Sequence, residues 1–201
     1  MTTRLRAGAL VPLRPAAPTL DDLSDPAVVA ACATGDRAAQ AALFTRHVDS
    51  VHRFVARMTT ADDDAVDDLV QGTFLTAFRC AGAFRGGAQV RTWLFGIAAN
   101  IVRTYARGEV RRKAMLRSVE GLPRAPIDLE SKVARSELLA RIPGAVAALP
   151  HDLRTALILV DFEETRGAEA AAALGVPEGT LWRRLHQARA ALRAALAGGD
   201  P

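Results

Sequence analysis

Side chains that could recognise charged partners gather between Asp62 and Lys113 in two groups of opposite sign. Five aspartates occupy the first seven positions, at 62, 63, 64, 67 and 68. From Arg79 to Lys113 the chain carries eight basic side chains and one acid, Glu109. Carboxylates pair with basic protein surfaces, whereas arginine forks match phosphates and guanine edges. The order of charge therefore indicates a non-covalent recognition module with two partners, one a basic protein and the other a nucleic acid.

The acidic group lies on a segment with helical periodicity. Apolar side chains recur every four residues and predict a buried row, at Val66, Val70, Phe74 and Phe78. Polar side chains recur at i, i+4 and i+7 on another face, at Asp64, Asp68 and Gln71. This face is a candidate docking surface. A solvated face with aspartates near a helix N-terminus, where the helix dipole favours them, has the same pattern.

The basic group contains a second amphipathic helix. Its apolar stripe consists of Leu94, Ile97, Ala98, Ile101 and Tyr105. Beside it runs a polar stripe made of Asn100, Arg103, Arg107 and Arg111. A row of guanidinium groups can follow a phosphate backbone, and an amide can read a base edge. A solvated arginine face is the alternative, and Gly108 is a candidate helix end that would leave Arg111 in a loop.

A short loop precedes this basic helix. Phe84 and Arg85 stand before two glycines, and Trp93 follows them. Glycines let the backbone approach a ligand closely, and aromatic side chains can stack on an unpaired base. The loop is thus a candidate base-binding site. An ordinary turn between two helices fits the glycines equally well, and Phe84 and Trp93 fit core positions as well as they fit a base platform.

The C-terminal residues 150–196 have the order helix, glycine turn, basic helix. An alanine-rich helix is predicted over 167–174, Gly175 makes the turn, and Pro177 suits the first position of the next helix. Polar and aromatic side chains on the outer and flanking faces of that helix are candidate DNA contacts: Thr180, Trp182, Arg183, Arg184 and Gln187. This order predicts a helix-turn-helix whose second helix enters a major groove, although other helical hairpins share it.

The elements that carry these side chains are all predicted to be helices, because alternating strand patterns are absent. We expect an all-α protein with two small helical domains joined by a flexible linker. A disordered tail is predicted over 1–24, and a first helix begins near Asp25, which can cap it. The first domain spans 25–113, the linker 114–133 and the second domain 134–201.

Composition limits the classes of function. The chain has 201 residues, a net charge of +4, and two cysteines distant in sequence, Cys32 and Cys80. No CxxC or HExxH motif occurs, and His47 and His52 would lie about 140° apart around a helix, which makes a poor metal-ligand pair. We expect no metal, no cofactor and no enzymatic activity. The expected location is the reducing cytoplasm, without a signal peptide or a membrane span.

Three segments together resemble the signatures of extracytoplasmic-function (ECF) sigma factors of bacterial RNA polymerase. They are DDLVQGTFLTAFR, FRGGAQVRTWLFGIAANIVRTYAR and LGVPEGTLWRRLHQARAALR. The first two resemble the promoter-melting domain (region 2), and the third resembles the C-terminal helix-turn-helix (region 4). The resemblance covers about 25–113 and 134–196. It implies a promoter-specificity subunit whose partners are core RNA polymerase, at the β′ clamp helices and the β flap, promoter DNA, and an anti-sigma factor.

The resemblance also implies roles for single residues. Asp67, Asp68 and Gln71 match the helix that docks on the β′ clamp helices. The Phe84–Trp93 loop and Asn100 match the part that captures a flipped base of the −10 element. Two arginines match the helix along promoter DNA, Arg103 and Arg107. The recognition helix for the −35 element is matched by Thr180, Arg183, Arg184 and Gln187.

Several positions depart from the family pattern. Gly72 stands where a glutamate is usual, Gly96 where an arginine is common, and Trp182 where a basic residue is common. Arg166 replaces a serine that often caps the first helix of the helix-turn-helix, so either Thr165 caps it or the cap is lost. The alternative to a sigma factor is a helix-turn-helix regulator that acts without core polymerase, which would leave the acidic helix unexplained.

Overall fold

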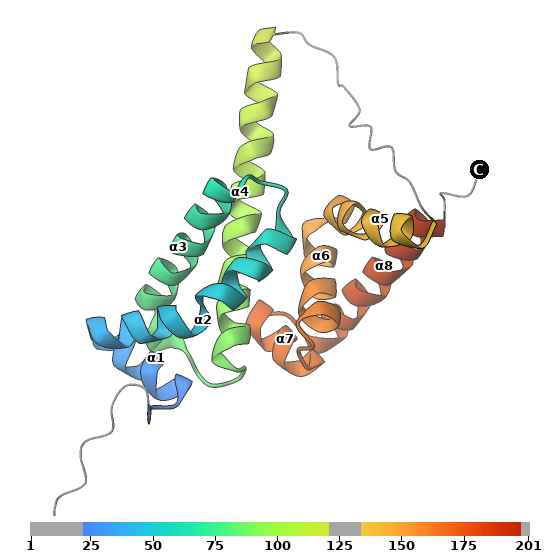
Figure 1. Ribbon diagram of the computed structural model, residues 1–201. Coiled ribbons are helices and arrows are strands. Elements are labelled where there is room, and N and C mark those ends of the chain that lie inside the picture. Colours follow the sequence, from blue (N-terminus) through green and yellow to red (C-terminus); the bar gives the residue numbers. More distant parts are fainter. Residues whose placement is uncertain (1–21, 121–133, 198–201) are drawn as a thin grey trace, which may run out of the picture.

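A computed structural model describes residues 22–120 and 134–197. Within these ranges every regular element is helical, as predicted. Residues 1–21 of the predicted tail and 121–133 of the predicted linker lie outside them. The helices form two groups, which we call the N-terminal bundle (α1–α4) and the C-terminal unit (α5–α8) (Figure 1).

The N-terminal bundle contains four α-helices and one 3-10 turn: α1 (Asp25–Ala33), α2 (Arg37–Met58), α3 (Asp63–Cys80), η2 (Ala81–Ala83) and α4 (Val90–Glu120). Aspartate side chains cap two of them. Asp36 accepts the N–H of Ala38 at 2.8 Å at the start of α2, and Asp62 accepts the N–H of Ala65 at 3.0 Å at the start of α3. The expectation that Asp25 caps the first helix is wrong, because Ser24 occupies the cap position and Asp25 is the first helical residue.

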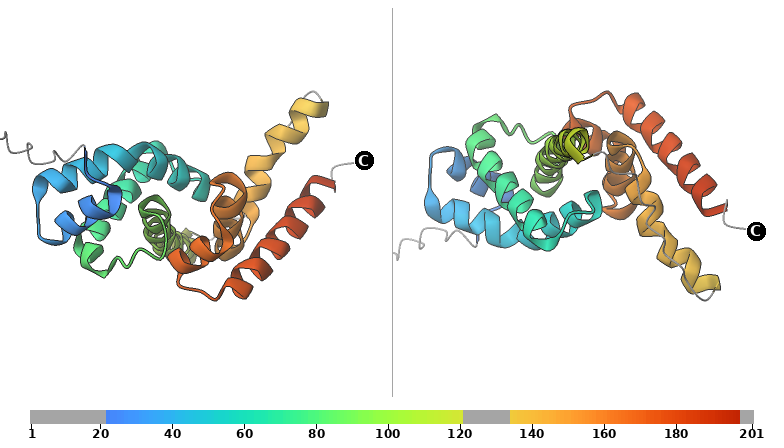
Figure 2. Two further views of the ribbon diagram at one scale, coloured as in Figure 1. Left: turned by 90° about the horizontal axis from the view of Figure 1, so that it is seen from below. Right: turned by 90° about the horizontal axis from the view of Figure 1, so that it is seen from above.

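Helix α4 is the central element of the molecule. It lies between the other bundle helices and the C-terminal unit, as the end-on views of Figure 2 show. Leu94 and Ala98 of the predicted apolar stripe are buried, but Phe95, Ala99 and Val102 are buried too, because α4 packs against α2, α3 and α7. Phe95 stacks on Phe54 of α2 with ring centroids 4.5 Å apart.

The helix continues well beyond the predicted domain boundary. Gly108 does not end it, and α4 runs to Glu120, so 114–120 of the predicted linker are helical. A single glycine in a helix interior costs only about 1 kcal/mol relative to alanine, which neighbouring helical residues can offset. Arg107 and Arg111 therefore both stand on a helix.

The C-terminal unit consists of a π-helical turn among four α-helices: α5 (Ala134–Ala148), α6 (His151–Leu157), η3 (Ile158–Phe162), α7 (Gly167–Leu174) and α8 (Glu178–Ala197). Helix α7 has the predicted bounds and ends at Gly175, whose backbone is left-handed (φ 63°). Pro177 is not the first helical residue as predicted. It precedes α8, and its carbonyl accepts the N–H of Thr180 at 2.9 Å.

The two groups of helices pack against each other. Their buried side chains form one continuous apolar cluster, and α7 lies directly on α4. At the crossing, a Cβ atom on Gly96 would overlap the carbonyl oxygen of Ala173. Only glycine permits this approach, so Gly96 is one of the contact points between bundle and unit.

Candidate protein and nucleic-acid interfaces

The predicted docking side chains of α3 form one exposed surface. Asp64, Asp67, Asp68 and Gln71, which we call the acidic face, are all exposed. Their spacing of three and four residues places them on adjacent turns of one helix side. His52 of α2 borders them, with its Nε2 atom 3.5 Å from a carboxylate oxygen of Asp67. The arrangement suits a partner that offers arginine or lysine side chains.

Two apolar side chains beside the acidic face were not predicted from the sequence. Phe44 of α2 lines a shallow hollow of about 320 Å³ together with Asp67, Asp68 and Gln71. It is 41% exposed, and Leu75, one turn beyond Gln71, is 52% exposed. Exposed large apolar groups beside charges are typical of protein interfaces. Leu75 could have been found from its i+4 spacing, whereas Phe44 is brought there only by the packing of α2 on α3.

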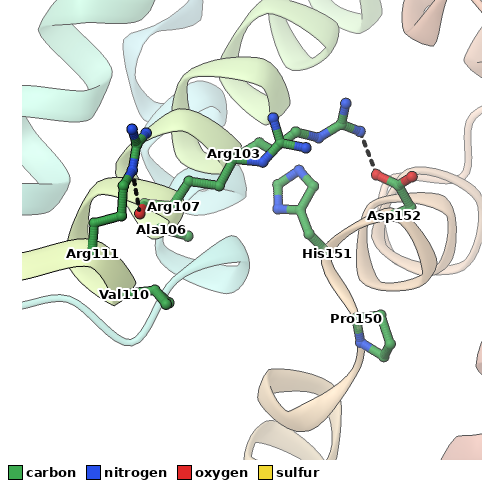
Figure 3. A pocket seen from close by; sticks show the side chains of 8 residues that line it. All are labelled: Arg103, Ala106, Arg107, Val110, Arg111, Pro150, His151 and Asp152. Carbon is green, nitrogen blue, oxygen red and sulfur yellow. Dashed lines mark hydrogen bonds and ion pairs between the residues drawn. The ribbon is translucent and has the colours of Figure 1, made fainter. Parts of the chain in front are cut away.

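The side chains of the basic stripe, Asn100, Arg103, Arg107 and Arg111, follow one flank of α4. Asn100, Arg107 and Arg111 are exposed, and Arg103 is half-buried. Three of them border a cleft of about 660 Å³ between α4 and α6, together with Pro150, His151 and Asp152 (Figure 3). Arg103 crosses this cleft to form an ion pair with Asp152. The predicted row of side chains therefore lies on one flank of α4, and one of its members, Arg103, is paired with a carboxylate.

His151 at the edge of this cleft was not singled out from the sequence. Burial, and next the charge of Arg103, lower its pKa to about 4. The side chain lines the cleft between α4 and α6, where the Arg103 guanidinium contributes a positive charge. At neutral pH it is an uncharged group of the interface, because a proton there would meet both a buried environment and a neighbouring cation.

The aromatic side chains of the predicted base-binding loop pack on each other. The ring centroids of Phe84 and Trp93 are 5.2 Å apart, and both side chains are half-buried against the core. Arg85 is exposed, and its guanidinium donates to the carbonyl of Gly82 at 2.8 Å. The structure thus packs the aromatic pair against the core and leaves both side chains partly exposed.

The predicted DNA-contacting side chains of α8 are not equally accessible. Trp182, Arg183 and Gln187 are exposed, while Thr180 and Arg184 are half-buried. Arg184 donates to Asp152 at 2.9 Å, so it shares this carboxylate with Arg103. Arg183 and Gln187 are therefore the polar side chains of this set that are most open to a partner.

Trp182 has a structural role that the sequence did not reveal. Its ring covers Gly167, where a Cβ atom would overlap the indole, and its Nε1 donates to Glu178 at 3.0 Å. The tryptophan, which stands where a basic residue was expected, thus fits because position 167 on α7 is a glycine. With 46% of its surface exposed, Trp182 also keeps a free edge.

The first turn of α7 has no side-chain cap. Arg166 occupies the cap position with an extended backbone (φ −61°, ψ 141°) and makes no cap hydrogen bond. Thr165 does not replace it, because its buried Oγ1 has no hydrogen-bond partner. The sequence left open whether Thr165 caps α7 or the cap is lost, and the structure shows that the cap is lost.

Across 22–120 and 134–197 no cluster of His, Cys, Asp or Glu side chains has metal-binding geometry. Within the same ranges no helix combines the length and the apolar character that a membrane crossing requires.

Comparison with known proteins shows to which family this chain belongs. The family model for Sigma-70 region 2 matches residues 43–112, and that for Sigma-70 region 4 matches residues 139–192. The ECF RNA polymerase sigma factor SigM of Mycobacterium tuberculosis is 35% identical over 173 residues, which cover 84% of this chain and 83% of SigM. The chain belongs to the ECF sigma factors. This sigma factor directs transcription and is not an enzyme. The region 2 match does not favour a regulator that acts without core polymerase.

Two solved structures resemble this sigma factor along most of its length. CnrH, in complex with the cytosolic domain of CnrY, is 29% identical with a TM-score of 0.61, covering 88% of this chain and 99% of CnrH. The sigma factor RpoE, in complex with the anti-sigma factor NepR from Bartonella quintana, is 25% identical with a TM-score of 0.56. The match covers 79% of this chain and 96% of RpoE. The all-α fold predicted from the sequence is confirmed.

Proposed function

We propose that this sigma factor binds core RNA polymerase through the acidic face of α3 and brings it to promoters that α4 and α8 read. The main support for this proposal is that the acidic surface and the arginine-bearing surfaces of the chain are separate. Four polar side chains of α3 are exposed on one helix side, and the arginines of α4 and α8 lie on others. A carboxylate surface repels DNA phosphates and attracts basic protein, so the acidic face suits the polymerase.

The basic stripe and the adjacent loop are proposed to engage the −10 element. Arg107 and Arg111 are exposed on consecutive turns of α4 and can follow a phosphate backbone. Asn100, also exposed, is proposed to hold a flipped base through its amide, with Phe84 and Trp93 forming the apolar wall beside it. The chain itself catalyses nothing. It stabilises unpaired bases while the polymerase synthesises RNA.

Helix α8 is proposed to read the −35 element from a major groove. Arg183 and Gln187 are spaced by four residues on its exposed side and can each form hydrogen bonds with a base edge. Thr180 and Arg184 flank them, and Trp182 can contribute an apolar contact to a thymine methyl group. The β flap of the polymerase is the proposed docking partner of this unit.

An anti-sigma factor is the proposed regulator of this sigma factor. The support is the structure of the similar sigma factor RpoE, which contains the anti-sigma factor NepR. The proposed site of action is the cytoplasm, where polymerase and chromosome meet.

Run-off transcription tests the proposal. Core polymerase is mixed with genomic DNA fragments of the source organism, with and without the full-length protein. New transcripts with discrete start sites that depend on the protein are the expected result. Transcripts that do not differ between the two mixtures would refute the proposed function.

The acidic face is tested by Asp68→Arg. Reversing this exposed charge replaces attraction to a basic partner with repulsion, so co-elution with core polymerase should be lost. Asp49→Arg, the same change at an exposed aspartate of α2 outside the acidic face, is the matched control and should bind normally. If both variants co-elute like the wild type, the acidic face is not the docking surface.

A further inference from the structure

The acidic face has few ion-pair partners within the described part of the chain. Among the residues that the structure describes, none forms an ion pair with Asp64 or Asp68, and Asp67 has only His52 of α2, at 3.5 Å. The Asp67 side chain is 75% exposed. Carboxylates on adjacent turns of a helix repel one another, so a cation nearby is attracted by all of them. The acidic face therefore favours a basic ligand.

Apolar side chains of α2 and α3 extend this face. Phe44 of α2 lines two shallow hollows, one of about 320 Å³ beside the acidic face and one of about 360 Å³ beside Phe78. Phe44 is 41% exposed, and Leu75 of α3 is 52% exposed. We call the acidic face together with Phe44, Leu75 and Phe78 the α2–α3 surface. A ligand that covers its apolar side chains removes them from water, so the surface suits a ligand that carries both cations and aliphatic groups.

The first residues of the chain contain a segment of this composition. Residues 4–14 read RLRAGALVPLR, with three arginines, four large aliphatic side chains and no acid. We call them the basic segment. They lie outside the described residues, which begin at Asp22 before α1. The cations of the basic segment complement the carboxylates of the α2–α3 surface, and its aliphatic side chains complement the exposed phenylalanine and leucine.

The chain is long enough to bring the basic segment to the α2–α3 surface. Helix α1 packs on α3 and on the η2 turn that follows it (Figure 1). The lengths of α1 and α3 together come to about 40 Å at 1.5 Å per residue. An extended chain from Arg4 to Asp22 spans up to about 60 Å. The basic segment can therefore reach every part of the surface without any change in the bundle.

A ligand in the same chain has an advantage over one from a second molecule. Only seven residues separate Arg14 from Asp22. A short tether gives its ligand an effective concentration on the order of millimolar. The basic segment of a second copy, present at micromolar concentration in a binding assay, competes poorly with it. The expected occupant of the α2–α3 surface is therefore the basic segment of the same chain.

We propose that the basic segment binds the α2–α3 surface of its own chain, with its arginines at the acidic face and its aliphatic side chains against Phe44 and Leu75. The segment and core RNA polymerase then compete for one surface, a consequence that rests on the proposed function. If the segment covers the surface in about nine of ten molecules, the apparent affinity for polymerase falls about tenfold. The first residues of the chain thus set how tightly the free protein binds polymerase.

Photo-cross-linking in the full-length protein tests where the basic segment binds. The variant Leu10→p-benzoylphenylalanine is irradiated, and mass spectrometry identifies the peptides joined to the segment. We expect cross-links to α2 near Phe44 and to α3 between Asp67 and Phe78. Cross-links to other helices only, or no cross-links, would overturn the inference.

Two controls sharpen this experiment. In an equal mixture of isotope-labelled and unlabelled protein we expect cross-links within one chain, and a majority between chains would show that a second copy occupies the surface instead. Asp67→Asn/Asp68→Asn should lower the yield of cross-links about threefold or more. Asp49→Asn, at an exposed aspartate of α2 outside the acidic face, should leave the yield unchanged. Equal yields from these variants would contradict the role of the acidic face.

Competition with polymerase is tested by changing the arginines of the basic segment. Arg4→Ser/Arg6→Ser/Arg14→Ser in the full-length protein should bind core polymerase about threefold to tenfold more tightly at low salt. Arg4→Lys/Arg6→Lys/Arg14→Lys keeps the positive charges and should bind like the wild type. Equal or weaker binding by the serine variant would overturn the inference while leaving the proposed function intact. A wild-type protein that does not bind core polymerase at all would instead refute the proposed function.

Discussion

Two of the residues that depart from the family pattern make close contacts in the structure. Gly96 stands where an arginine is common, and it admits the α7 backbone against α4. Trp182 stands where a basic residue is common, and it covers Gly167 of α7. Gly72 differs from both, because a Cβ atom there would make only an ordinary contact with Ile101 at 3.9 Å. Nothing in the structure explains that glycine.

Arg183 is the residue whose proposed role is simplest to isolate. It is exposed on α8, and Arg193, also exposed, lies later on the same helix. Arg183→Ala should weaken promoter binding by the polymerase–sigma complex by about 1–3 kcal/mol and relax specificity at one base pair of the −35 element. Arg193→Ala is the control. Equal affinities of both variants on wild-type and mutated promoters would remove Arg183 from the base contacts.

His151 predicts how stability depends on pH. Burial and the charges of Arg103 and Arg154 hold its folded pKa at about 4 against the opposing effect of Asp152, while the unfolded value is about 6.5. Between these values the unfolded state binds more protons, so the free energy of unfolding increases with pH. Above pH about 6.5 His151 therefore does not lower the free energy of unfolding. As the pH falls from there towards 4, protonation of His151 in the unfolded state reduces the free energy of unfolding.

Urea denaturation at a series of pH values measures this effect. His151→Gln removes the titrating group and should flatten the dependence in this window. A residual slope of the same sign is expected from His47, whose pKa is also lowered by burial. A slope in the variant as steep as in the wild type would show that His151 is not protonated on unfolding.

At the scale of elements, α7 is a short helix that relies on its neighbours. Eight residues are too few for a helix to be stable alone in water. Its cap position holds Arg166, which makes no cap hydrogen bond, and its alanine side chains offer little apolar area. Packing on α4 and α8 and the bond from Glu169 to the start of α4 compensate. The stability of α7 is thus coupled to its contacts with α4 and α8.

Restoring the cap should stabilise this element. Arg166→Ser places a hydroxyl where the backbone already has cap geometry, and we expect the free energy of unfolding to rise by about 1 kcal/mol. Arg166→Ala removes the same side chain without supplying an acceptor, so the difference between the two variants isolates the cap. Equal urea midpoints for both would mean that the hydroxyl does not cap α7.

At the scale of the whole molecule, the contact between bundle and unit should respond to salt. Two ion pairs across this contact are partly exposed: Arg57 of the Arg57–Glu163 pair is 42% exposed, and Asp152 of the Arg103–Asp152 pair is 41% exposed. The screening length falls from about 10 Å in 0.1 M salt to about 3 Å in 1 M salt. We expect the radius of gyration of the protein, measured by small-angle X-ray scattering, to increase over this range. A radius independent of salt would indicate that apolar packing alone holds bundle and unit together.

The sequence by itself determined the helices and the charge of their faces. The bounds of α7, the aspartate surface of α3 and the arginine stripe of α4 follow from side-chain types spaced by three and four residues. These features are local, because caps and helix faces depend on residues within about one or two turns. The order of these motifs also identified the family, which the comparisons confirm.

Only the tertiary structure decided which faces meet. The Glu169 carboxylate is 80 positions away from the N–H of Gln89 that it binds, and the Arg57 side chain is 106 positions away from Glu163. No periodicity links such residues, because their proximity arises from apolar burial and close approach at Gly96. The depressed pKa of His151 and the sharing of Asp152 by two arginines have the same origin. Both arise where bundle and unit come into contact, and neither helix group alone contains them.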